Sequence, residues 1–257
     1  MSFLIISVVA LVASGLTFFS GFGLGTLLLP AFSLFVPVDQ AVALTAVVHF
    51  LNSIYKVVLV GRLTDRSVLV RFGLPAIVAA GGGAWVLGQL AAGPPLLEYD
   101  AFGRHCSVTP VNLAIGLLVS IFAVLELLPF TSGLAFGPRW LVLGGAVSGF
   151  CGGLSGMQGA LRSAFLIRVG LSKEAFVATG AAIACLVDLS RLSVYASRLV
   201  VVAGDLDIPL LAAAIAAAFT GATLGRLVLP KVKLVAVQRM VATMLLVVAA
   251  CLIAGLC

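Results

Sequence analysis

The stretch GFGLGTLLLP, residues 21–30, interrupts an apolar run that covers residues 3–36. Glycines in such a run weaken a helix and expose backbone polar groups, which hydrocarbon does not satisfy. The whole run is also longer than the roughly 20 residues that one membrane-spanning helix needs. We therefore expect two short helices, 3–20 and 24–36, that meet at a glycine tip inside the membrane.

A second apolar run, 139–170, is equally too long for one span and contains GFCGGLSGMQG at residues 149–159. We expect two more short helices there, 139–150 and 157–170. Shifting the chain by 134 residues superposes the two broken runs, and it also superposes Gly25 on Gly159 and Thr45 on Thr179. The sequence therefore predicts two repeats, residues 1–130 and 131–257.

The composition is that of a membrane protein. Hydrophobic residues make up 62% of the 257 positions and charged residues 9%, whereas a soluble domain is about a quarter charged. So few charges are not enough to cover a water-soluble surface. The remaining apolar segments have spanning length and are 39–60, 68–92, 108–128, 174–197, 207–229 and 235–256. We predict an all-α polytopic protein of the cell inner membrane, in which each repeat has a broken helical hairpin followed by three transmembrane helices.

The charges of the loops distinguish two topologies. If each broken run crossed the membrane once, the repeats would be parallel and the basic residues would divide five against seven. If each run is a hairpin that returns to its starting side, they divide ten against two, as the positive-inside rule requires. Arg104 and Arg198 are then opposite the other ten. Those ten are Arg62, Arg66, Arg71, Arg139, Arg168, Lys173, Arg226, Lys231, Lys233 and Arg239. Five segments per half, an odd number, predict inverted repeats with both termini outside.

The broken helices also predict a binding site for an anion. A helix that begins inside the membrane has unpaired first N–H groups, and these donors attract an anion together with the positive end of the helix dipole. Broken helices at matching positions of inverted repeats are typical of secondary transporters. The alternative is that the glycines only allow close helix packing. The expected donors are Gly23, Gly25 and Thr26 in the first half, and Gly156, Gln158 and Gly159 in the second.

Polar side chains within the apolar runs are further candidate ligands. Thr45, His49, Asn52 and Lys56 follow one another at helical spacing and therefore share one helix face. His49 is a candidate proton carrier or donor to an oxyanion; the alternative is a structural histidine bonded to Asn52 or to a neighbouring helix. Lys56 is closer to the membrane boundary, where we expect its side chain to snorkel. Thr179 is the repeat equivalent of Thr45.

Arg162 falls in the short helix that follows the second tip, where a charge has to be paired. Its guanidinium fork suits the oxygens of a small oxyanion. The alternative is a structural ion pair with Asp188 or Glu126. Asp188 and Arg191, in turn, have the spacing of two residues that pair with each other on one helix.

The chain resembles the sulfite exporter TauE/SafE family, part of the toluene sulfonate uptake permease group. The resemblance is carried by GFGLGTLLLP at 21–30, by VDQAVALT at 38–45 and by LSKEAFVAT at 171–179, together with the size and the duplicated organisation. The second copy differs, because it has GMQG at 156–159 and Ala164 in place of the proline. The resemblance implies a permease for small sulfur-containing anions such as sulfite or an organosulfonate.

We therefore expect a secondary transporter for such an anion, working in the direction of export because an inside-negative potential favours anion efflux. A passive anion channel and a transporter of a non-sulfur organic acid are the alternatives. We expect no enzyme activity, catalytic residue, metal or cofactor, since the sequence has neither GxxxxGK[ST] nor a nucleophile–base signature. The expected partners are the anion and membrane lipid but no nucleic acid, and a homo-oligomer is left open.

Overall fold

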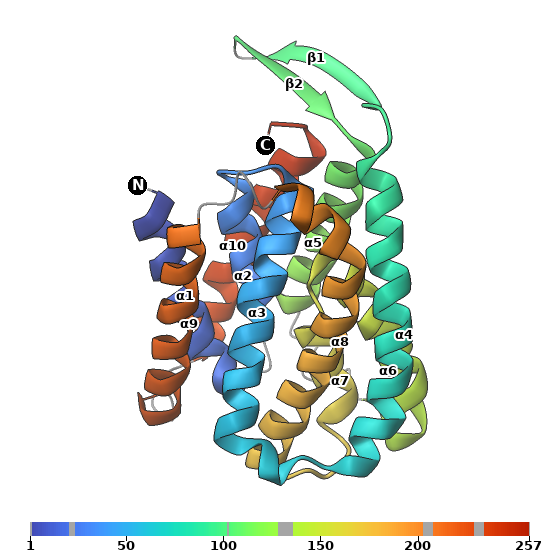
Figure 1. Ribbon diagram of the computed structural model, residues 1–257, viewed down its shortest axis with the longest axis vertical. Coiled ribbons are helices and arrows are strands. Elements are labelled where there is room, and N and C mark those ends of the chain that lie inside the picture. Colours follow the sequence, from blue (N-terminus) through green and yellow to red (C-terminus); the bar gives the residue numbers. More distant parts are fainter. Residues whose placement is uncertain are drawn as a thin grey trace.

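The computed structural model describes residues 2–20, 24–101, 103–127, 136–202, 208–228 and 234–256, which are almost entirely helical (Figure 1). The first half contains α1 (Ser2–Ser20), α2 (Leu24–Ser33), α3 (Val38–Val60), η1 (Gly61–Leu63), α4 (Arg66–Ala91), β1 (Leu97–Ala101), β2 (Arg104–Val108) and α5 (Pro110–Leu127). The second contains η3 (Pro138–Trp140), α6 (Leu141–Ser155), α7 (Gly159–Leu166), α8 (Lys173–Val202), α9 (Ile208–Val228) and α10 (Leu234–Ile253).

The prediction of an all-α polytopic membrane protein is confirmed. Within the described residues, four helices are long and apolar enough to cross a membrane; they cover Gln40–Leu63, Arg66–Ala91, Lys173–Ala196 and Ile208–Gly225. Large apolar side chains point outward from them; Val58 is 77% exposed and Val78 is 78% exposed. A surface of this kind is stable against lipid, because lipid tails do not penalise exposed hydrocarbon.

The second break lies further along the chain than expected. α6 does not end at residue 150 but continues to Ser155, so both Gly149 and Gly153 lie within the helix. The chain then turns at Gly156, whose φ of +78° is left-handed, and α7 begins at Gly159 and ends before residue 170. Gly149 and Gly153 stay helical because they face α4 at close range. For these two glycines the packing alternative is therefore correct, and Gly156 forms the tip.

Helices of the two halves pack in matching pairs. α1 packs against α9 and α6 packs against α4, and these two pairs are equivalent under the repeat shift. α3 packs against α8 and α5 against α10, which in each case joins two equivalent helices. In Figure 1, α3 and α8 run in opposite directions, and so do α4 and α9. Inverted repeats require these directions; the orientation of the two halves in a membrane stays a prediction.

Small residues hold the first helix of each hairpin against the opposite half. A Cβ atom on Gly149 would lie 2.2 Å from the carbonyl oxygen of Ala76, and one on Gly221 would lie 2.1 Å from that of Leu11. Backbones approach this closely in membrane helices where small residues line the contact. Because α1 and α6 are each fixed to the other half, the start of α2 and the Gly156 tip that follows α6 lie between the halves.

The sequence did not predict the two-stranded hairpin between α4 and α5. Its strands β1 and β2 are antiparallel, with Tyr99 opposite Cys106, and Gly103 turns between them with a φ of +71°. The hairpin projects beyond the helices at the end where α10 finishes (Figure 1). Ser107 N–H donates to the Gly255 carbonyl at 3.2 Å and the Tyr99 hydroxyl donates to the Ala254 carbonyl. The hairpin therefore covers the C-terminal end of α10.

We expect cysteines placed at Leu63 and Ile208 to be labelled from opposite faces of the membrane. Leu63 follows α3 and Ile208 follows α8, and both side chains are more than half exposed. Because α3 and α8 are repeat equivalents, inverted repeats put the two positions on opposite sides, whereas parallel repeats put them on one side. A membrane-impermeant maleimide, applied to intact and to permeabilised cells, measures this after the five native cysteines have been replaced. Labelling of both positions from the same face would contradict the inverted topology.

Candidate functional site

Gly25 at the start of α2 lies against the second glycine tip, between the halves. A Cβ atom on Gly25, in the first turn of α2, would lie 2.7 Å from the carbonyl oxygen of Gly156 and 3.6 Å from Cγ2 of Thr45. Gly156 adopts a left-handed conformation that other residues rarely reach. The structure thus brings together three of the predicted site residues, which come from α2, from the turn between α6 and α7, and from α3.

Several buried polar groups of α3 and of the second hairpin have no hydrogen-bond partner among the described residues. They are Thr45 Oγ1, Asn52 Nδ2, Gln158 Nε2 and Oε1, and Arg162 Nη1. An unsatisfied buried polar group costs about 1–3 kcal/mol, so folded proteins pair nearly all of them. Four of these five atoms are hydrogen-bond donors when the hydroxyl is counted as one. A substrate rich in acceptor oxygens would satisfy them.

Arg162 extends from α7 toward α8 and is 9% exposed. A Cβ atom on Gly180 would lie 3.5 Å from its Nε, so the guanidinium rests against a glycine of α8. It is within electrostatic range of Asp188 and of Lys56. No ion pair of the described residues includes Arg162. The predicted structural pair with Asp188 does not form, and the side chain of Glu126 lies outside the described part.

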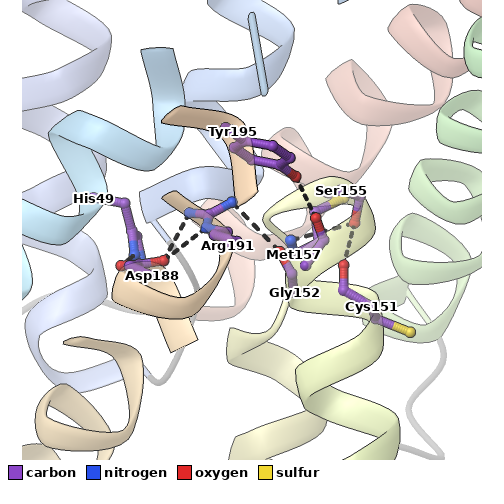
Figure 2. Close-up of polar contacts among 9 residues, drawn as sticks. His49, Cys151, Gly152, Ser155, Met157, Asp188, Arg191 and Tyr195 are labelled. Carbon is purple, nitrogen blue, oxygen red and sulfur yellow. Dashed lines mark hydrogen bonds and ion pairs between the residues drawn. The ribbon is translucent and has the colours of Figure 1, made fainter. Parts of the chain in front are cut away.

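A buried ion-pair network joins α3 to α8. Asp188 Oδ1 accepts from Arg191 Nε at 2.9 Å and lies 2.7 Å from Arg191 Nη2, so the predicted pairing of these two residues is confirmed. The other carboxylate oxygen, Oδ2, lies 2.5 Å from Nδ1 of His49. Figure 2 shows Asp188 between His49 and Arg191. His49 is therefore bonded to a neighbouring helix, which is one of the two contacts that we expected for a structural histidine.

Arg191 extends this network to the second tip. Its Nη1 donates to the Gly152 carbonyl at 3.4 Å (Figure 2), and a Cβ atom on Gly156 would lie 2.7 Å from the same nitrogen. One turn further along α8, the Tyr195 hydroxyl donates to the Gly153 carbonyl. The Gly152 carbonyl also accepts from the N–H of the C-cap residue Gly156 at 2.8 Å. The two side chains therefore add to the cap of α6, at the end where carbonyls lack regular helical partners. Sequence reasoning missed Tyr195, which carries no motif.

Two equivalent serines support the neighbouring candidates. Ser14 Oγ donates to Asn52 Oδ1 at 3.0 Å, and Ser148 Oγ donates to the Gln158 carbonyl at 3.2 Å. The 134-residue shift superposes Ser14 on Ser148. In each half, a serine of the first hairpin helix therefore holds one predicted site residue. The side-chain amide nitrogens of Asn52 and Gln158 remain unpaired donors.

The other predicted residues have separate positions. The Thr179 hydroxyl accepts from the N–H of Asp65 at 2.9 Å, so it holds the turn before α4 instead of joining the tips. Thr26 is buried in α2, and Gly159 is the first residue of α7. Gly23 lies outside the described residues.

The face of α3 that the sequence predicted is fully enclosed. Thr45, His49 and Asn52 are at most 5% exposed, and Lys56 is 9% exposed. The expectation that Lys56 snorkels to the boundary is therefore wrong, because its side chain turns into the helix bundle. Helical spacing predicted that all four residues share one face. On that face His49 contacts α8, Asn52 contacts α1 and Thr45 contacts α2.

The described buried charges are mostly positive. Lys56, Arg162 and Arg191 contribute three positive charges, and Asp188 is the one carboxylate among the buried described side chains. With neutral His49 the formal net charge of this group, with each other side chain in its usual charged form, is +2. Buried charge that is not balanced is strongly unfavourable, so the enclosed region favours an anion. No described group of three or more His, Cys, Asp and Glu side chains could hold a metal ion.

A family model described as "Sulfite exporter TauE/SafE" matches residues 6–252. No curated protein matches the chain. The matched region includes the first broken hairpin from residue 6 onward, the whole second hairpin and all the candidate site residues.

Proposed function

The chain belongs to the sulfite exporter TauE/SafE family, and from this membership we propose that it is a secondary transporter that exports a small sulfur-containing anion, sulfite or an organosulfonate, across the cell inner membrane. The family indicates a membrane transporter of sulfite or related anions and not an enzyme. The direction, the coupling and the residues that bind the anion are the parts that we add.

The excess of buried positive charge is the observation that carries this proposal. Arg162 has an unpaired Nη1 and no ion pair among the described residues, while Asp188 is already bonded to Arg191 and His49. A tetrahedral or pyramidal oxyanion presents several acceptor oxygens to a guanidinium fork. The same anion would accept hydrogen bonds from Thr45, Asn52 and Gln158, so one ligand satisfies both the charge and the unpaired donors.

The position of the tips suggests how the anion moves. Substrate sites of transporters with broken helices lie near the membrane midplane, where one repeat can rock against the other. Here Gly25 of the first half touches Gly156 of the second half. Relative movement of the halves would separate these tips and expose the anion to one side at a time. An inside-negative potential then favours export by about 2.3 kcal/mol per charge per 100 mV.

Binding and efflux measurements test this function. We expect purified protein to bind sulfite, thiosulfate or an organosulfonate in preference to a carboxylate of similar size. In proteoliposomes, efflux of labelled sulfite should saturate with concentration and should accelerate when potassium and valinomycin make the interior negative. Empty liposomes provide the control. Preference for the carboxylate would indicate an organic acid transporter, and flux that does not saturate would indicate a passive channel.

A further inference from the structure

The His49–Asp188 pair is buried, and only the histidine side chain has a small exposed fraction. The Asp188 side chain is 0% exposed, whereas that of His49 is 6% exposed. A ring nitrogen and a carboxylate oxygen only 2.5 Å apart share a proton. Nδ1 of the imidazole is therefore occupied, and Nε2 is the atom that can take up a second proton. Histidine is the side chain whose ordinary protonation range includes neutral pH.

The surroundings of the pair are cationic. The charged or titratable groups within electrostatic range of it are Arg191 and Cys185 of α8 and Arg162 of α7. Lys56 of α3 is within electrostatic range of Arg162. α2 and the described side chains of α5 and α9, which also pack on α3, include no ionisable group near it. Cys151 of α6 is half-buried, and the basic residues of η1 and α4 are exposed at the helix ends; these are Arg62, Arg66 and Arg71.

We propose that the His49–Asp188 pair is a proton-binding site that couples proton movement to anion transport. This inference rests on the proposed function and adds its coupling ion. The proton is taken up at Nε2 of His49, the imidazolium remains paired to Asp188 through Nδ1, and the proton leaves from Nε2 after the anion has left.

Electrostatics gives the sign of the coupling. A proton on His49 raises the net charge of the buried group from +2 to +3, and Arg162 lies within electrostatic range of it. The protonated site therefore binds an anion more tightly, and by linkage the bound anion raises the proton affinity by the same factor. Anion and proton thus move together. A dianion that carries one proton still moves one net negative charge, so the membrane potential still drives export.

The network also connects the proton to the moving parts. His49 belongs to the first half, and Asp188 and Arg191 belong to the second. Arg191 in turn holds the Gly152 carbonyl beside the Gly156 tip. A change of charge on His49 therefore acts on a contact between the halves and on the cap of α6 at the same time. The Asp188–Arg191 ion pair thus links the proton site to the Gly156 tip, which has to move during transport.

Binding at several pH values tests the coupling with methanesulfonate, whose own charge does not change near neutral pH. For the wild type we expect the Kd to decrease about tenfold between about pH 8 and about pH 6, within the usual range of coupling between two sites. In proteoliposomes with the potential clamped at zero, an outward sulfite gradient should carry protons, detected with a pH-sensitive dye. His49→Gln should weaken binding, but above all it should reduce the pH effect on Kd to less than about twofold.

The chain offers a matched control, because its only other histidine, His105, also forms a pair through Nδ1, with Asp100 at 3.1 Å on the exposed hairpin. His105→Gln should retain the tenfold pH effect. A His49→Gln protein with the wild-type pH effect would overturn the proposal. So would a wild type that transports sulfite without proton movement, a result that needs no variant and leaves the proposed function intact. A wild type that neither binds nor transports any of the anions would overturn both.

Discussion

Replacement of Arg162 by glutamine is expected to weaken anion binding by about 10- to 100-fold. The guanidinium is buried in α7, has an unpaired Nη1 and belongs to no ion pair among the described residues. A hydrogen bond to a charged group contributes about 1.5–3 kcal/mol, and every 1.4 kcal/mol changes a dissociation constant about tenfold. Glutamine keeps a donor but removes the charge and the fork. The Kd for labelled sulfite, measured on purified protein, gives the loss directly.

Two further variants sharpen this result. Arg162→Lys keeps the charge without the planar fork, so its Kd should lie between those of the wild type and the glutamine variant. Arg71→Gln removes an exposed arginine of α4 and should bind as the wild type does. If Arg162→Gln binds sulfite normally but melts at a lower temperature, Arg162 is a structural residue, and the excess of buried positive charge has another purpose.

The sequence predicted the helices well because lipid imposes simple rules on it. Apolar length and the cost of an unpaired backbone place a helix in each run, and α3 begins at Val38 and ends at Val60, within a residue of the predicted 39–60. The spacing of Thr45, His49, Asn52 and Lys56 likewise predicts a shared face, since periodicity along one helix needs no knowledge of its neighbours. Local patterns of this kind are visible in a single sequence.

Local patterns could not predict the contacts between segments that are distant in the sequence. His49 and Asp188 are 139 residues apart, and no local feature of either helix indicates that they meet. The second break was placed too early for the same reason. A glycine within a helix that packs on another helix and a glycine at a turn look alike in sequence, and only the approach of Gly153 to Ala80 distinguishes them. The hairpin of β1 and β2 was missed because the search followed apolar length alone.

Replacement of Gly25 by valine is expected to reduce sulfite efflux by roughly tenfold or more, while alanine should cause a smaller loss. Even a single Cβ atom at this position would lie 2.7 Å from the carbonyl oxygen of Gly156, so one of the two tips must move. Gly156 cannot easily retreat, because its left-handed turn lies against Nη1 of Arg191. Overpacking a tight contact costs about 1–3 kcal/mol, and here the strain falls on the contact that separates during transport.

A glycine elsewhere in a helix separates this effect from general damage. Gly82 lies within α4, and a Cβ atom on it would meet nothing within 4 Å, so Gly82→Val should transport normally. Gly159→Val should resemble Gly25→Val, because Gly159 is the repeat equivalent of Gly25 and begins α7. Efflux is measured in vesicles, with the amount of protein and its monodispersity in detergent determined alongside. If both valine variants at the tips transport sulfite normally, the tips only pack the two halves together. The anion must then be held without the tips, on the enclosed face of α3 that carries His49, where Thr45 and Asn52 have unpaired groups.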